Sequence, residues 1–328
     1  MTDSGTGVTG GGGTAAALFV GADGQTRWFW RLLAFAALTV GATLVLTLIV
    51  VPVAAKVMSA DAVRFIAFNW ITIAGLLVAH AASLAWVDRH RPWSFVLLGR
   101  DSLGARRIAL GLAVGALAIG VPVLALLGTG WMREAPAPAG SWWGAAWQFA
   151  LVLLPAALAE ELMFRGYPFA VLRERFGWRA AVVATSVLFG LVHLANPGVT
   201  AEAIMMVIVA GVFLAAVLLV TESLYAAWAA HFAWNWTMAA LMHAPVSGLP
   251  MPTPGYRLLD AGPDWATGGA WGPEGGLGAL LGMTVGLWYL WSRPAARARL
   301  MDAPRGTMPD TMHETTNTDA RPVSRGES

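Results

Sequence analysis

The sequence has no cysteine, a single lysine (Lys56) and few charged residues of either sign. Without cysteine the chain can form no disulfide, no thiolate metal site and no cysteine nucleophile. Charged residues make up only 12% of the 328, about half the share typical of soluble globular proteins. Hydrophobic residues make up 57%, which is more apolar surface than one water-facing domain can bury. The composition therefore predicts that lipid surrounds most of this chain.

The chain also lacks the marks of a nucleic-acid-binding protein and of a cleavable signal peptide. Its net charge is +2 and its pI about 9.4, but the arginines lie between apolar runs, where basic residues set membrane orientation. No nucleic-acid partner is therefore expected. The first long apolar run follows Arg27 and Arg31 and is too long for a signal sequence, so it indicates a retained anchor. The high arginine, alanine and glycine content is typical of a bacterial protein, which points to the cell (inner or plasma) membrane.

Long apolar runs are what the sequence has in abundance. A bilayer-spanning helix needs about 20 apolar residues, and helices are the alternative to a closed barrel, whose strand alternation is absent here. The runs lie at 32–54, 65–87, 108–128, 143–164, 180–196, 203–220, 223–242 and 276–292. We therefore predict an all-α membrane protein, a multi-pass bundle of about eight transmembrane helices.

The arginines predict the orientation of this bundle. With eight spans, 17 of the 21 basic residues fall on the side that also holds both termini, and the other side keeps only Lys56, Arg64, Arg133 and Arg257. The positive-inside rule then predicts that both termini are cytoplasmic.

The same pattern divides the chain into segments of different character. Their order is a disordered cytoplasmic N-terminus (1–26), N-terminal transmembrane helices (27–142), a core with the polar motifs (143–242), an outer loop (243–275), a last transmembrane helix (276–292) and a disordered cytoplasmic tail (293–328). The outer loop is rich in Pro, Gly and Trp and is expected to cap the bundle. The tail has too little apolar surface to fold alone.

Ionisable groups at the end of the fourth apolar run need an explanation, because they are costly within a membrane. Glu161 and Arg165 are four residues apart with the acid first, the favourable order for an ion pair on one helix face. Glu160 points about 100° away from that face, which leaves it free for another task. The simpler interpretation, that these charges only mark a helix end, is stronger for the paired residues than for Glu160.

Two histidines and an asparagine lie in later apolar runs. His231 and Asn235 are four residues apart and share a face, whereas His193 lies in the fifth run. A lone intramembrane histidine is often a hydrogen-bonding group between helices, but two stacked polar side chains favour a functional cluster.

The chemistry of these side chains points to hydrolysis by an activated water. A carboxylate in an apolar pocket can accept and return a proton, and an imidazole can hold the water. A second imidazole and an amide suit a developing oxyanion. G-x-S-x-G and H-E-x-x-H are absent, and the only lysine lies in an outer loop. A zinc ion held by Glu160, His193 and His231 is the second alternative, since nothing in the spacing requires a metal.

Together these residues resemble the CPBP family, which comprises CAAX proteases and bacteriocin-processing proteins. The chain contains the three family motifs in order: E-E-x-x-x-R (Glu160, Glu161, Arg165), F-x-x-x-H (Phe189, His193) and H-x-x-x-N (His231, Asn235). The resemblance covers about 145–240. It implies a metal-independent intramembrane endopeptidase in which Glu160 is the general base, assisted by His193, while His231 and Asn235 stabilise the oxyanion. Glu161 and Arg165 are then supporting residues, and no cofactor is implied.

One geometric question stays open in the sequence. If the fourth helix ends at Arg165, Glu160 lies only about 8 Å below the cytoplasmic surface, whereas His193 lies roughly 20 Å deep. The two can share a water only if the helix continues past Gly166 and Pro168 toward Arg173, or if the next helix is strongly tilted.

The expected partners are the lipid bilayer and a peptide or membrane-protein substrate. Two other hypotheses remain: a non-catalytic immunity or regulatory protein that binds a peptide in the same cavity, and a proton-coupled transporter. The transporter hypothesis predicts an inverted repeat or a pair of broken helices, and neither is evident in the sequence.

Overall fold

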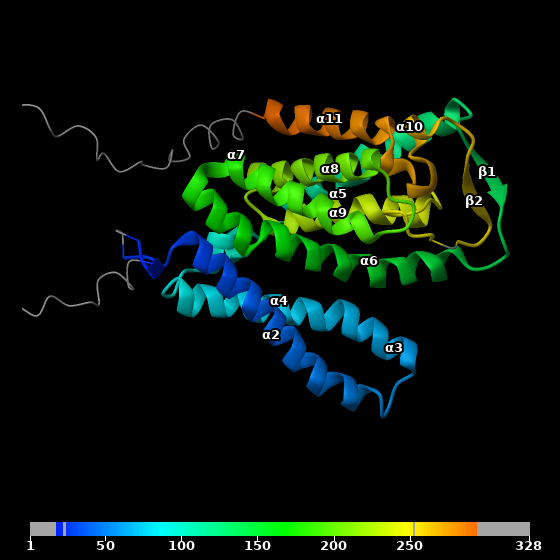
Figure 1. Ribbon diagram of the computed structural model, residues 1–328. Helices are drawn as coiled ribbons and strands as arrows, with labels where there is room; N and C mark the ends of the chain where they lie inside the picture. Colours follow the sequence, from blue (N-terminus) through cyan, green and yellow to red (C-terminus); the bar gives the residue numbers. More distant parts are fainter. Residues whose placement is uncertain (1–17, 22–23, 252, 294–328) are drawn as a thin grey trace, which may run out of the picture.

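In the computed structural model, residues 18–21, 24–251 and 253–293 are described, and they form a helical bundle with a two-stranded sheet at one end (Figure 1). The main helices are α2 (Trp28–Ala54), α4 (Thr72–Ala82), α5 (Ala105–Gly128), α6 (Trp142–Arg165), α7 (Tyr167–Leu191), α8 (Ala201–Thr221), α9 (Leu224–Trp236) and α11 (Leu277–Ser292). Shorter segments are α3 (Ala60–Phe65), η1 (Ile66–Ile71), η2 (Ser83–Val87), η3 (Trp93–Val96), η4 (Arg100–Ser102), η5 (Val192–Ala195), η6 (Thr237–Leu241), α10 (Asp264–Thr267), η7 (Gly269–Trp271) and η8 (Pro273–Gly275). The strands are β1 (Met132–Pro136) and β2 (Tyr256–Asp260).

Five helical stretches in the described part of the chain are long and apolar enough to cross a membrane. They are Trp28–Ala54, Ala62–Val87, Ala105–Gly128, Trp142–Ala195 and Ala201–Thr221. The fourth contains two successive helices, α6 and α7, and α11 is a shorter apolar helix. The prediction of an all-α, multi-pass membrane protein is therefore confirmed in its general form. The number of eight spans and the cytoplasmic termini stay predictions, and the predicted disordered ends lie mostly outside the described residues.

Helix α2 has the surface expected of a lipid-facing element. Val40 and Leu48, both within α2, are 68% and 66% exposed, although they are large and apolar. Such exposure would be costly in water and is favourable only against hydrocarbon. In Figure 1, α2, α3 and α4 form a layer beside α6.

A buried cluster of charges joins this layer to the remainder of the bundle. Arg31 of α2 contacts Asp88 at 2.7 Å and Glu174 of α7 at 2.5 Å, and Arg91 reaches the same Glu174 at 2.6 Å. The Arg31 side chain is only 6% exposed, so both of its carboxylate partners are needed to compensate its burial. The cluster fixes the part of α7 before Gly177 to the N-terminal helices.

Helices α5 and α9 approach closely because glycines line one face of α5. A Cβ atom on Gly111 would lie 2.2 Å from the carbonyl oxygen of Ala226, and one on Gly115 would lie 2.1 Å from that of Ala230. Small residues four apart allow helix backbones to pack in membranes, where van der Waals contact drives association. This contact lies directly behind His231, the residue after Ala230.

A small layer covers the end of the bundle that is opposite to the start of α5. Strands β1 and β2 pair antiparallel, with Met132 opposite Asp260 and Pro136 opposite Tyr256. The predicted outer loop contains β2, α10, η7 and η8, and it folds over the ends of the helices as a cap (Figure 1).

Candidate active site

Tryptophan side chains fasten α6 to α9, the two helices that carry the first and third motifs. Each indole N–H donates to a backbone carbonyl of the other helix or of the turn that extends it. The bonds run from Trp142 to Ala240 (2.8 Å), from Trp236 to Ala146 (3.0 Å) and from Trp228 to Leu154 (2.8 Å). These contacts fix the rotation of each helix, so that Glu160 and Glu161 face His231.

A break at Gly166 separates the helix that carries Glu160 from the helical path that follows it. Helix α6 ends at Arg165, and α7 begins at Tyr167 and stays helical until Gly177, whose φ of 81° reverses the chain. His80 stabilises the break: its Nδ1–H donates to Leu76 O (2.8 Å), and its Nε2 accepts the Tyr167 N–H (3.0 Å). Helix α6 itself therefore does not continue past Gly166, which the first alternative requires; the chain beyond the break forms a new helix, α7.

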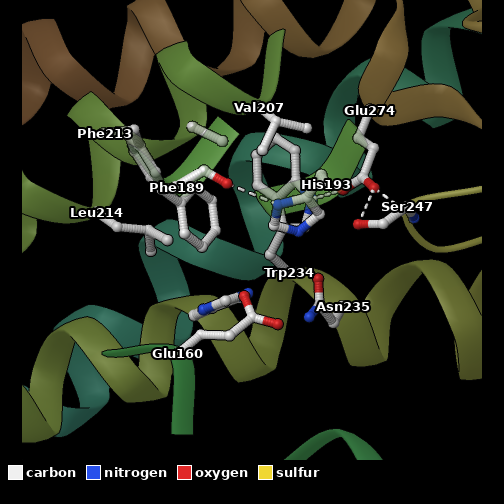
Figure 2. A pocket seen from close by; sticks show the side chains of 12 residues that line it. Glu160, Phe189, His193, Val207, Phe213, Leu214, Trp234, Asn235, Ser247 and Glu274 are labelled. Atoms are coloured by element: carbon white, nitrogen blue, oxygen red, sulfur yellow. Dashed lines mark hydrogen bonds and ion pairs between the residues drawn. The ribbon is translucent and has the colours of Figure 1, made fainter. Parts of the chain in front are cut away.

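The structure brings Glu160, His193, His231 and Asn235 to the wall of one cavity of about 40 Å³ (Figure 2). Glu160 comes from α6, His193 from the short turn η5, and the other two from α9. A water needs roughly 10–15 Å³ and two or more polar partners. The cavity therefore has room for the water that hydrolysis requires.

Glu161 binds Arg165, as expected from their spacing, and also His231, a contact that the sequence did not predict. Its Oε1 accepts from Nη1 of Arg165 at 3.3 Å and from Nδ1 of His231 at 2.9 Å. Arg165 also donates to Gly211 O at 3.1 Å, and its guanidinium lies 4.2 Å from the centre of the Phe189 ring. The predicted Glu161–Arg165 pair is thus present, and its second function is to hold the His231 ring.

Glu160 is placed differently from its neighbour. Its side chain is 36% exposed, and Oε2 lies 3.7 Å from Nε2 of His231, beyond hydrogen-bonding distance. That oxygen is buried and has no hydrogen-bond partner within the described chain. A carboxylate oxygen without a protein partner at the wall of a water-sized cavity is able to accept a proton from water.

His193 presents one free nitrogen to the same cavity. Its Nδ1 lies 2.7 Å from the carbonyl oxygen of Phe189, which can only accept, so Nδ1 carries a hydrogen. Nε2 of the neutral ring is then an acceptor. Phe189 packs edge-on against His193 and His231, with ring centres 4.9 and 5.8 Å away. Phe189 therefore packs against the rings of both histidines.

Two further polar residues of the cavity wall, Ser247 and Glu274, were missed in the sequence. Both belong to the outer loop, where an isolated glutamate among prolines and glycines gives no periodic signal. Glu274 is 8% exposed only because the loop folds against α9, where Trp234 donates to its carboxylate.

The zinc alternative requires at least three ligands close together. Among residues 18–21, 24–251 and 253–293, no group of three or more His, Asp or Glu side chains lies close enough to hold a metal ion. Nδ1 of His231 is bonded to Glu161 and Nδ1 of His193 to a backbone carbonyl, so a metal ion could bind these rings only through Nε2. The absence of a metal ion stays a prediction.

Comparison with known proteins adds an independent observation. Residues 142–237 match the Rce1-like family, described as type II CAAX prenyl endopeptidase Rce1-like. The matched range begins at the first residue of α6 and ends just after α9, so it includes all three motifs. The predicted family resemblance is therefore confirmed for this segment. No curated protein and no solved structure matches the chain.

Proposed function

From the premise that residues 142–237 match an endopeptidase family, we propose that this chain is an intramembrane endopeptidase that hydrolyses peptide bonds with a glutamate-activated water. The observation that carries the proposal is the position of Glu160, whose unpartnered oxygen lies at a cavity shared with two histidines and an asparagine.

In the first step, Glu160 accepts a proton from a water that also donates to Nε2 of His193. The water oxygen forms a bond to the peptide carbonyl carbon, and the carbonyl electron pair moves to its oxygen. Asn235 and His231 then donate hydrogen bonds to this oxyanion, as preorganised donors do in acyl transfer. In the second step, Glu160 returns its proton to the departing amide nitrogen, the C–N bond breaks, and a carboxylic acid and an amine leave.

The geometry of His231 sets a condition on this scheme. Because Nδ1 donates to Glu161 at 2.9 Å, Nε2 can donate to the oxyanion only when the ring carries both hydrogens. Glu160 and Glu161 both lie beside the His231 ring, and Arg165 forms an ion pair only with Glu161. Thus Glu161 has a role in the proposed reaction through His231.

The substrate class follows from the surroundings of the cavity. Glu160 is its more exposed member, whereas His193 and His231 are 8% and 6% exposed, so a peptide reaches the reacting groups from the Glu160 side. We propose a peptide or membrane-protein segment as substrate and the bacterial cell membrane as the location, with no metal ion in the reaction.

Purified protein in lipid vesicles, tested with a quenched peptide library, checks this proposal. We expect cleavage by the wild-type chain and a loss of roughly 10²–10⁴-fold in kcat for Glu160→Gln, the range attributed to general acid–base catalysis. Glu134→Gln is the matched control, because Glu134 is an exposed glutamate on β1. A Glu160→Gln variant that retains both cleavage and the cellular phenotype would instead support the non-catalytic, peptide-binding protein.

A further inference from the structure

Glu274 is a buried carboxylate of the cavity wall that the proposed reaction does not use. It is 8% exposed and lies in η8, in the outer loop. Its Oε1 accepts from the N–H of Ser247 (2.5 Å) and from the Ser247 hydroxyl (2.8 Å), and its Oε2 accepts from the indole N–H of Trp234 (2.9 Å). Because both oxygens already have donors, Glu274 is built to hold its partners in place and not to take a proton from water.

Ser247 stands at the tip of a tight turn, Val246–Leu249. Two backbone hydrogen bonds of 3.0 and 2.8 Å join Val246 and Leu249. Ser247 has a φ of 49°, in the left-handed region that side chains other than glycine rarely adopt. A strained conformation of this kind persists only where the surrounding structure fixes it. The two hydrogen bonds that Ser247 donates to Glu274 have this effect, and the bond from Trp234 holds the Glu274 carboxylate in turn.

The same turn is tied to a second catalytic element. Nδ2 of Asn196 donates to the carbonyl oxygen of Ser247 at 2.9 Å. Asn196 ends η5, three residues after His193, and Trp234 directly precedes Asn235. The turn Val246–Leu249 therefore links the element that carries His193 to the helix that carries His231 and Asn235. In Figure 2, Ser247 and Glu274 lie together next to His193.

We propose that Glu274 is a positioning residue: through Ser247 it ties η5 to α9 and so sets the separation of His193 from the His231–Asn235 pair. The proposal rests on the function proposed above. The tie is needed at this place because η5 is a single short turn at a helix end, where helices fray most easily. His193 is otherwise anchored by the hydrogen bond to Phe189, which belongs to its own helix.

Glu274→Gln tests the proposal with little change in shape. The glutamine side chain keeps one acceptor oxygen, and its NH₂ group would face a donor, so either the Ser247 or the Trp234 contact is lost. A misplacement of about 1 Å can cost about 10²-fold in rate. We expect kcat to fall by roughly 10- to 100-fold while KM changes by less than about threefold.

Two other variants make this kinetic test specific. Asn196→Ala removes the hydrogen bond between Asn196 and Ser247 and should lower kcat similarly. The double variant with Glu274→Gln should be little worse than either single variant, because both substitutions interrupt the same chain of hydrogen bonds. Glu134→Gln, an exposed change in the same outer layer, should have wild-type kinetics.

A second readout does not depend on catalysis. Since the chain has no cysteine, Val207→Cys places a single thiol in the cavity wall at a position that is 5% exposed. A cavity of about 40 Å³ is too small for a maleimide, so labelling should be slow in the otherwise wild-type chain and about tenfold faster with Glu274→Gln. Ala215→Cys, at a fully buried position of α8, reports general loosening and should stay unreactive in both.

The outcomes separate this proposal from the proposed function. Unchanged kcat and unchanged labelling in Glu274→Gln would overturn the positioning role, as would equally fast labelling at Ala215→Cys. If the wild-type chain cleaves no peptide but Glu274→Gln speeds labelling at Val207→Cys, the tie stands and the peptidase assignment is lost. A loss of kcat together with selective labelling at position 207 supports both.

Discussion

Adjacent residues of α6 have opposite environments, because one step along a helix rotates a side chain by about 100°. Glu161 is fully buried between Arg165 and His231, whereas the side chain of Glu160 is 36% exposed and one of its oxygens has no hydrogen-bond partner among the described residues. Substitutions at the two positions should therefore have different consequences. The Glu160 change acts on the proposed chemistry, and the Glu161 change acts on the fold as well.

Glu161→Gln should destabilise the protein, since it leaves the fully buried guanidinium of Arg165 without its carboxylate partner. Removing one member of a buried ion pair costs about 3–5 kcal/mol. Thermal unfolding in detergent should show a clear drop in Tm, whereas Glu160→Gln should unfold close to the wild-type temperature. Activity of Glu161→Gln should fall too, because Glu161 accepts the hydrogen bond that orients His231.

The double variant Glu161→Gln, Arg165→Met checks the reason for that loss. With both charges removed, no buried ion is left without a partner, and replacing a buried pair by groups of similar volume is often neutral. The double variant should be more stable than Glu161→Gln alone. A double variant that is less stable would show that Arg165 matters mainly through its contacts with Gly211 and Phe189.

Removal of metal ions should leave the activity unchanged. In the described part of the chain the candidate catalytic residues do not form a metal-binding group, and the proposed reaction takes its proton acceptor from Glu160. Activity should be the same before and after dialysis against EDTA, and added Zn²⁺ should not increase it. Loss of activity with EDTA and recovery with Zn²⁺ would return the zinc alternative to first place.

At the scale of the helices, the contact between α5 and α9 carries the position of His231. A Cβ atom at Gly115 would lie 2.1 Å from Ala230 O, a backbone atom that can move only with its helix. Gly115→Ala should therefore push α9 away, lower stability by about 1–3 kcal/mol as overpacking does, and reduce kcat. Gly128→Ala, at the open end of the same helix, should be neutral or slightly stabilising. Equal Tm and kcat for the two variants would contradict this.

Much of the helical framework could be predicted from the sequence, because lipid solvent requires long apolar helices. The eight predicted runs coincide with helical segments to within a few residues. For the run at 180–196, the matching segment is the part of α7 after Gly177, followed by η5, and the helical part of α7 before Gly177 was not predicted as a separate element. The spacing of four residues also placed Glu161 with Arg165 on one helix face. This prediction and that of the long apolar helices depend only on local helix geometry.

Other features could not be predicted because they depend on distant parts of the chain. The end of α6 at Arg165 is stabilised by His80 of α4, which caps the start of α7. The close contact of α5 with α9 requires Gly115 and Ala230, which are far apart in the sequence. Glu274 lies at the cavity wall because its carboxylate accepts hydrogen bonds from Ser247 and Trp234. No periodic pattern in the sequence records such contacts.

For the whole molecule, the arginine distribution predicts the orientation in the membrane. The hairpin of α5 and α6 offers two positions at which this orientation can be tested. Ala105 begins α5 on the side predicted to be cytoplasmic. Ala139 lies between β1 and α6, directly after Pro138, whose carbonyl accepts a hydrogen bond from Gly255 of the predicted outer loop. Both positions are exposed. Since the chain has no cysteine, Ala105→Cys and Ala139→Cys each introduce the only thiol.

A membrane-impermeant maleimide added to intact cells should label Ala139→Cys at once and Ala105→Cys only after the membrane is permeabilised. The physical reason is that translocating the Arg-rich segments at 88–107 and 165–179 is unfavourable, so the side with 17 of the 21 basic residues stays inside. The opposite labelling pattern would show that the protein has the reverse orientation. The exposed side of Glu160 would then face the opposite side of the membrane. Labelling of both thiols in intact cells would show that α5 does not cross the membrane, and would remove the support that α5 gives to α9.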